Sequence, residues 1–275
     1  MPLHRVAFCP QPPVLVPELA GQAAAELDTL RRAADAAVRD LLGRAVDRIV
    51  VVGGQDPGRT PGGPRPALGG MPTAYRPPLH ASFRPWGVAT DVQLTARPQP
   101  ATAPGGQPPP PGAHPAAEAV GPAARLPLSL TMAAWLLSRN GLDPATTAVE
   151  MIEVPAGAAP ADCQRWGREL AADGPSALLV MGDGSACRGL SSPGYHDERA
   201  EPFDDRIAAA LAAADHQALA ALPPDLATEL QVAGRTTWQL AAAAVAATAA
   251  DWSGRVDHYA APYGVAYFVA SWHRN

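Results

Sequence analysis

The chain has 275 residues, 47% of them hydrophobic, which is enough to bury a substantial core. All 21 basic residues are arginine, and the lack of lysine excludes an internal Schiff base, a pyridoxal-phosphate lysine and the lysine of a phosphate-binding loop. The net charge of −5, with no basic run longer than Arg31-Arg32, argues against a nucleic-acid-binding surface. Small molecules or proteins are therefore the expected partners.

Neither a signal-peptide pattern nor an apolar span of about 18 residues occurs, so we expect no membrane span. The cysteines Cys9, Cys163 and Cys187 are odd in number and widely spaced, which indicates free thiols and no zinc pair of the CxxC kind. These features favour a cytoplasmic protein.

The N-terminal part of the chain predicts a β-α-β unit. Residues 5–8, Arg5-Val6-Ala7-Phe8, are typical of a short strand. Apolar side chains then recur at three- and four-residue steps from Leu19 to Leu41, which predicts one amphipathic helix. The run from Ile49 to Val52, ending in Gly53-Gly54, is typical of a buried parallel strand whose end opens into a loop.

The rest of the chain continues this alternation. Further strands are predicted near 86–95, 147–154, 177–182 and 263–270, and helices near 128–139, 161–172, 203–221 and 225–249. The expected fold is α/β and three-layered, with a central, mostly parallel or mixed sheet between helices. We expect one domain over residues 1–275.

Proline and glycine are too dense for regular elements at 56–79 and 97–125. The second stretch is expected to be a flexible insertion within the domain. Its run Pro108 to Pro111 could bind a polyproline-reading domain, although a solvated insertion between two strands is the simpler interpretation.

The turn Gly182-Asp183-Gly184-Ser185 follows a predicted strand, where open α/β sheets place their ligands. Its spacing matches neither a dinucleotide-binding loop nor a nucleophile elbow. Asp183 and Ser185 are candidate catalytic residues, and a hydrogen-bonded structural turn is the alternative.

The segment 193–204 is dense in charge. Tyr195 or His196 could face a substrate as an acid. In the alternative interpretation Asp197, Glu198 and Arg199 form a solvated loop and Asp204 caps a helix.

Six segments resemble the class III extradiol ring-cleavage dioxygenases, in a LigB-like branch of uncharacterised actinobacterial proteins. They are CPQPPVLVPEL at 9–19, VVVGG at 50–54, LPLSLTMAAWLL at 126–137, MGDGSACR at 181–188, PGYHDERAEPFD at 193–204 and APYGVAYFVASW at 261–272. The resemblance covers nearly the whole chain and implies the LigB-like extradiol dioxygenase fold. It also implies a possible homodimer or a complex with a different protein chain.

In that family two histidines and a carboxylate hold Fe(II), and another histidine transfers protons. This sequence places other residues at the matching positions: Gln11 for the first histidine, Gln55 and Asp56 for the second, Ala186 for the proton-transfer histidine and Arg235 or Thr236 for the carboxylate. The resemblance therefore implies a lost iron site. An arginine at the fourth position would repel a divalent cation and could bind a carboxylate or phenolate instead.

A replacement zinc site is a minor alternative, with Cys9, Asp56 and Asp183 as its ligands and His4 or His196 nearby. His4 and Cys9, five residues apart around a strand, should lie on opposite faces. The remaining histidines, His80, His114, His216, His258 and His273, are expected in loops, on a helix surface or at the terminus.

We therefore expect no cofactor, and a small phenolic or carboxylate ligand in the former active-site cleft. Its candidate catalytic residues are Asp183, Ser185, His196 and Arg235, and its candidate lining residues are Gln11, Gln55, Asp56 and Tyr195. The protein would bind this ligand or perform non-iron chemistry on it. An inactive homologue acting as a partner subunit or scaffold is one alternative, and an active Fe(II) dioxygenase is another.

Overall fold

A computed structural model describes residues 3–43, 46–55, 70–95 and 125–275. These residues form a mixed seven-stranded sheet in the order β3-β6-β2-β7-β1-β9-β8, and a separate two-stranded sheet, β4-β5. The strands are β1 (Arg5–Cys9), β2 (Arg48–Gly54), β3 (Thr73–Tyr75), β4 (Leu79–Ser82), β5 (Asp91–Leu94), β6 (Ala148–Val154), β7 (Ala177–Met181), β8 (Trp252–Ala260) and β9 (Tyr267–Arg274).

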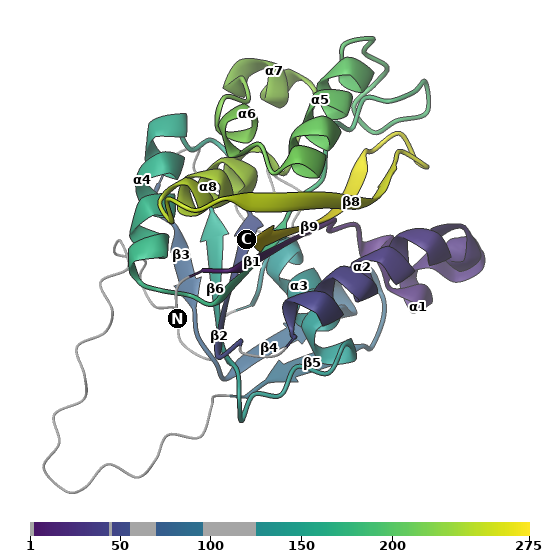
Figure 1. Cartoon of the computed structure of the whole chain (residues 1–275). Helices are drawn as coiled ribbons and strands as arrows, with labels where there is room; N and C mark the ends of the chain where they lie inside the picture. The colour runs from purple at the N-terminus through teal and green to yellow at the C-terminus, as the bar shows by residue number, and fades with distance from the viewer. Residues whose placement is uncertain (1–2, 44–45, 56–69, 96–124) are drawn as a thin grey trace, which may run out of the picture.

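Helices cover both faces of the large sheet (Figure 1). They are α1 (Pro17–Ala20), α2 (Asp28–Leu41), α3 (Leu128–Arg139), α4 (Pro160–Ala172), α5 (Ala200–Ala213), α6 (His216–Ala220), α7 (Pro224–Glu229) and α8 (Arg235–Ala246), with 3-10 turns η1 (Pro13–Leu15), η2 (Gly21–Leu27) and η3 (Arg84–Trp86). Side chains of α2 and α3 pack in one core cluster, and those of α4, α5 and α8 in another. The predicted α/β arrangement, with a central mixed sheet between helices, is confirmed.

The four central strands β6, β2, β7 and β1 run parallel, and β3, β9 and β8 add antiparallel edges. Val50 and Val52 face the α8 side, whereas Ile49 and Val51 face the α3 side. A strand buried on both faces needs apolar residues at every position, which explains the continuous run in β2. These parallel strands, and helices α3 and α4, match their predicted ranges to within one or two residues.

Several predicted elements are wrong in detail. The strand predicted near 86–95 is shorter, as β5, and pairs with β4 outside the central sheet. The strand predicted at 263–270 lies later in the chain, as β9. The stretch 56–79, predicted to lack regular elements, contains β3, and the edge strand β8 was not predicted. The insertion at 97–125 lies outside the described residues except for Arg125.

Three predicted helices are interrupted. The helix predicted over 19–41 divides into α1, η2 and α2, and Gly21 at the first junction has a φ of 55°. Ala214 separates α5 from α6 with a φ of 51°, and Gln231 follows α7 with a φ of 54°. Because tertiary packing holds these two non-glycine residues in a left-handed conformation, their apolar periodicity could not reveal the breaks.

Helices α4 and α8 pack side by side on one face of the sheet (Figure 1), and α8 begins close to Ala156, which shortly precedes α4. A Cβ atom added at Gly167 of α4 would lie 2.3 Å from the carbonyl oxygen of Leu240 and 2.6 Å from the Cβ atom of Ala243. The close approach of the two helices therefore requires glycine at this position.

We expect Gly167→Ala to lower the free energy of unfolding by about 1–3 kcal/mol, because the backbone of α8 cannot move away cheaply. The loss should outweigh the gain in helix propensity of about 1 kcal/mol. Urea unfolding measures it. Gly189→Ala is the control, since a Cβ atom there meets nothing within 4 Å. Equal stability of the two variants would contradict the tight packing.

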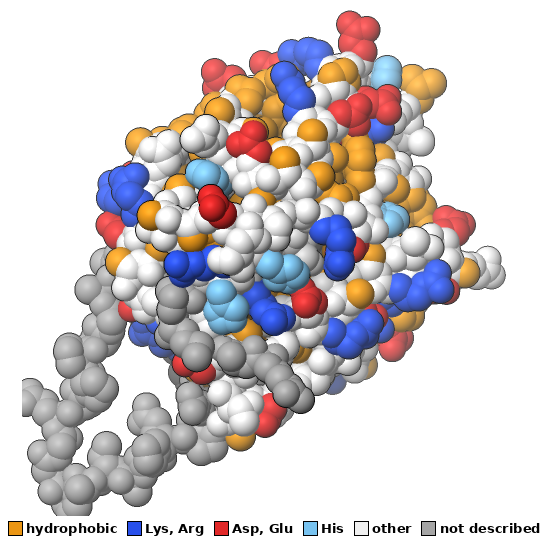
Figure 2. Space-filling model, in the orientation of Figure 1, with side chains coloured by type: hydrophobic (Ala, Val, Ile, Leu, Met, Phe, Trp, Pro, Cys, Tyr) orange, Lys and Arg blue, Asp and Glu red, His pale blue; other side chains and the backbone are white. Residues whose placement is uncertain are grey.

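No helix in the described ranges is both long and apolar enough to cross a membrane. On the face seen in Figure 2, basic and acidic side chains are interspersed. This face therefore lacks the continuous basic surface that would neutralise nucleic-acid phosphates.

Candidate functional site

The carboxyl ends of β1, β2 and β7 meet at one edge of the sheet, and the first turn of α8 lies against two of them. A Cβ atom on Gly182, after β7, would be 2.5 Å from the Cα atom of Gly234, and one on Gly54, in β2, would be 3.0 Å from the carbonyl oxygen of Ala233. The glycines that end these strands thus let the start of α8 approach the backbone. This is the edge where α/β sheets bind ligands.

Gln11 and Asp183 meet at this edge. The backbone N–H of Gln11 donates to Oδ1 of Asp183 at 2.9 Å, and the backbone N–H of Gly234 donates to the carbonyl oxygen of Asp183 at 2.9 Å. Part of Asp183 remains accessible, but desolvation by the surrounding protein raises the pKa of its carboxyl to about 7, against the opposing effect of the Gln11 N–H. Asp183 is therefore a carboxyl group that can exchange a proton near neutral pH.

Tyr267 begins β9 and directly follows Ala266, whose carbonyl oxygen accepts the backbone N–H of Gly184 at 2.8 Å. The side chain of Tyr267 is buried, and this burial, followed by the charges of Asp183 and Tyr263, raises the pKa of its phenol. Within the described residues Tyr267 Oη forms no hydrogen bond. We call Gln11, Asp183 and Tyr267 the strand-end cluster. Tyr267 was not among the predicted site residues; its place in a β-strand made it look like a core aromatic residue.

The side chain of Gln11 supplies an unsatisfied group. Gln11 is 7% exposed, and its Oε1 atom is buried without a hydrogen-bond partner among the described residues. A buried acceptor left unpaired costs about 1–3 kcal/mol. An ordered water or the hydroxyl group of a ligand would remove this penalty.

Cys9 ends β1 just before this cluster. Burial, chiefly, raises the pKa of its thiol, so Cys9 stays protonated and is a poor metal ligand. His4 lies at the other end of β1, and Asp56 is outside the described residues. Among the residues that the structure describes, no group of three or more His, Cys, Asp or Glu could hold a metal ion. Within that part of the chain, Cys9, Asp183, His4 and His196 therefore form no such group.

Ser185 is part of a buried hydrogen-bond network that holds the turn after β7 in place. It is fully buried, its backbone N–H donates to Oδ1 of Asp204 at 2.9 Å, and its Oγ donates to Oδ2 of the same carboxylate at 2.5 Å. Asp204 also forms an ion pair with Arg188 at 3.5 Å, and burial raises the pKa of the Asp204 carboxyl. Asp204 lies inside α5, and it holds the turn after β7 instead of capping a helix.

Arg235 begins α8 but is directed away from the strand-end cluster. Its Nη1 donates to Oε1 of Gln239 at 2.9 Å, and its Nη2 donates to the carbonyl oxygen of Ala156 at 3.1 Å. Ala156 follows β6, which is separated from β1 by β2 and β7. Arg235 therefore faces the junction of α4, α8 and the end of β6.

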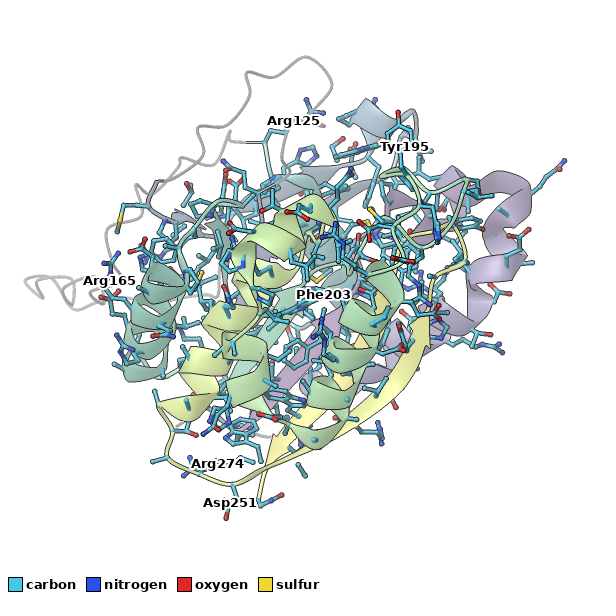
Figure 3. The ribbon with its side chains drawn as sticks, turned by 90° about the horizontal axis from the view of Figure 1, so that it is seen from above. Arg125, Arg165, Tyr195, Phe203, Asp251 and Arg274 are labelled. Atoms are coloured by element: carbon cyan, nitrogen blue, oxygen red, sulfur yellow. The ribbon has the colours of Figure 1, made fainter. Side chains whose placement is uncertain are left out.

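The other candidates lie at the surface or beside a strand end. Tyr195 is 83% exposed and lies at the periphery of the molecule, and His196 is exposed next to it (Figure 3). Asp197 pairs with Arg199 at the surface, as the solvated-loop interpretation expects. Gln55 is half-buried at the end of β2, where its backbone N–H donates to the carbonyl oxygen of Val154 at 2.8 Å.

The described histidines other than His4 and His196 occupy β4 (His80), the start of α6 (His216), β8 (His258) and β9 (His273). The predicted position of His258 outside regular strands is therefore wrong, as is that of His80. His114 is outside the described residues. None of these elements contributes a histidine to the strand-end cluster.

Comparisons with known proteins assign no function. No family model and no curated protein matches the chain. Among solved structures, an uncharacterised protein from Escherichia coli K12 matches with 12% sequence identity and a TM-score of 0.47. The match covers 98% of this chain and 99% of that one.

Proposed function

We propose that the protein is a class III extradiol dioxygenase-like protein, with the LigB-like fold, that has exchanged its iron site for a binding site for a small phenolic molecule. The strand-end cluster forms the core of this site. The ligand hydroxyl donates to Gln11 or Asp183, and Tyr267 provides a phenol hydrogen bond.

The observation that carries this proposal is the buried, unpaired Oε1 atom of Gln11 beside Asp183. Both groups accept hydrogen bonds, and one of them has no partner in the described protein. A phenolic O–H is a good donor, and its ring can pack against Tyr267 and the neighbouring Tyr263.

A phenol fits the cluster better than a carboxylate does. No arginine contributes to the pKa shift of Asp183, and Arg235 is turned toward Ala156. A carboxylate beside Asp183 would meet a second negative charge whenever Asp183 is ionised. With a pKa near 7, Asp183 can instead take up or return the proton of a bound hydroxyl group.

The residues at the positions that resemble the iron ligands do not fit an Fe(II) centre. Gln11 and Gln55 carry neutral amides, and Arg235 carries a positive charge. Iron chemistry is therefore not part of the proposed function.

The test is calorimetric titration with catechol, compared with its dimethyl ether, which has the same ring but no O–H donor. We expect saturable binding of catechol alone. Gln11→Leu, which removes the unpaired acceptor and keeps a similar volume, should weaken catechol binding roughly fivefold, the equivalent of about 1 kcal/mol.

Gln217→Leu, at an exposed position of α6, is the matched control and should bind catechol as the wild type does. Equal affinity for catechol and its ether, or no binding of either, would rule out the phenol site. Anaerobic Fe(II) titration followed by a ring-cleavage assay in air tests the iron chemistry separately. Stoichiometric iron with cleavage would restore an oxygenase.

A further inference from the structure

Arg235 is a buried cation without a described counter-ion. The residue is 4% exposed, and the first turn of α8 contains no acidic residue. Its two hydrogen bonds go to neutral oxygen atoms, one on Gln239 and one on Ala156. Desolvation lowers the pKa of the guanidinium, and among the described residues the one opposing charge comes from the Cys163 thiol. Because the pKa of that thiol is itself raised to about 11, Cys163 is uncharged at neutral pH.

Helix dipoles make this position still more positive. Arg235 is the first residue of α8, where the dipole favours a negative charge. Helix α4 begins shortly after Ala156, which Arg235 contacts, so the positive end of α4 lies at the same end of the helix pair. The acid in the first turn of α4, Asp162, forms an ion pair with Arg165 at 2.8 Å.

Further donors at the start of α8 lack acceptors. The backbone N–H groups of Arg235, Thr236 and Thr237 donate to no described residue. Thr236 is 2% exposed, and its Oγ1 atom is buried without a hydrogen-bond partner in the described ranges. An anion with several oxygen atoms would accept hydrogen bonds from these donors. It would also supply the negative charge that Arg235 lacks among the described residues.

The guanidinium is less deeply buried on the side of Ala156 than on the side of Gln239. Its hydrogen bond to Gln239 is fully buried, but its hydrogen bond to Ala156 is only partly so. Ala156 is half-buried, and the next residue, Gly157, is exposed. The β6–α4 loop therefore provides the side from which a small ion could enter.

We propose that Arg235 and the first turn of α8 form a binding site for a small oxyanion, a phosphate or carboxylate group, on the side of the helix start where the guanidinium faces Ala156. The guanidinium supplies the opposite charge and its remaining N–H donors. Thr236 and the free backbone N–H groups add neutral hydrogen bonds. This site does not depend on the proposed phenol site.

The experiment is thermal unfolding in Tris chloride, titrated with inorganic phosphate at constant ionic strength, with a parallel titration by acetate. We expect a saturable rise in Tm for the wild type. Arg235→Met, which keeps an apolar side chain of similar length, should weaken the response at least about tenfold, because a charge-assisted hydrogen bond is lost. Arg235→Lys should retain part of it, since lysine keeps the charge without the planar fork.

Arg165→Met is the control, an exposed arginine on the neighbouring helix, and should respond as the wild type does. A response to phosphate but not acetate identifies a phosphate group, and the reverse identifies a carboxylate. An equal response of Arg235→Met and the wild type, or no saturable response of the wild type, would overturn the proposal.

An internal counter-ion is tested by Asp56→Asn and Glu118→Gln, the acidic residues outside the described ranges. If either variant responds to phosphate while the wild type does not, that acid neutralises Arg235 and the oxyanion site is refuted. Should Arg235→Met fail to fold, phosphorus-31 relaxation of phosphate with the wild type decides, because unchanged relaxation excludes binding.

Discussion

Replacing Asp183 with asparagine should remove a large part of the dependence of stability on pH between about pH 4 and pH 7. The pKa of Asp183 rises from 3.8 to about 7 in the folded protein because of desolvation. A raised carboxyl pKa contributes stability that is fully present below the unfolded pKa and is lost as the pH rises through the folded pKa. At about 1.4 kcal/mol per pH unit, the loss amounts to at most about 4 kcal/mol.

Asparagine cannot ionise, and it keeps an oxygen atom that can accept the N–H of Gln11. The variant should therefore be more stable than the wild type above pH 7. Urea unfolding across this pH range measures the difference. Asp143→Asn, at an exposed turn where the carboxylate accepts the N–H of Ala145, is the control and should follow the wild-type profile. Identical profiles for Asp183→Asn and the wild type would show that Asp183 ionises freely in the folded state.

Replacing Asp204 with alanine should lower the free energy of unfolding by about 3–5 kcal/mol, because it breaks a buried charged network by removing one partner. The substitution leaves the backbone N–H and Oγ of Ser185 without their acceptor, and leaves Arg188 without its buried carboxylate. Chemical denaturation measures the loss.

Asp205→Ala is the matched control. Asp205 is the next residue of α5, and its carboxylate accepts a hydrogen bond from Tyr259 at an exposed position. Its loss should cost less than about 1 kcal/mol, as for other exposed polar contacts. A similar cost for both substitutions would mean that the Ser185 turn does not depend on Asp204.

The sequence located the main elements where burial alone dictates residue type. In β2 and β7 every position faces a core, so continuous apolar runs identify the strands. The edge strand β8 alternates half-buried and exposed residues from Trp252 to Asp257. This alternation, with a period of two residues, could have identified β8 as a strand. The polar residues and Gly254 obscured the pattern in the sequence.

The candidate site was also predicted only in part. The rule that parallel strands end at one edge placed Gln11 and Asp183 together, and in the structure a hydrogen bond joins them. The same rule grouped them with Ser185 and Arg235, whose side chains point to Asp204 and Ala156 instead. Tyr267 was missed because nothing local distinguishes a core tyrosine from one beside a buried carboxyl.

The sequence by itself thus determined the four buried parallel strands and helices α3 and α4, since hydrophobic periodicity follows from burial on one face or two. It also determined which residues follow the strand ends. Only the tertiary structure decided where those side chains point, because the direction depends on partners distant in the chain. The side chain of Ser185 donates to Asp204, and that of Arg235 donates to Ala156 and Gln239. Desolvation, which makes Asp183 a proton-exchanging group near neutral pH, likewise exists only once the surrounding chain has packed around it.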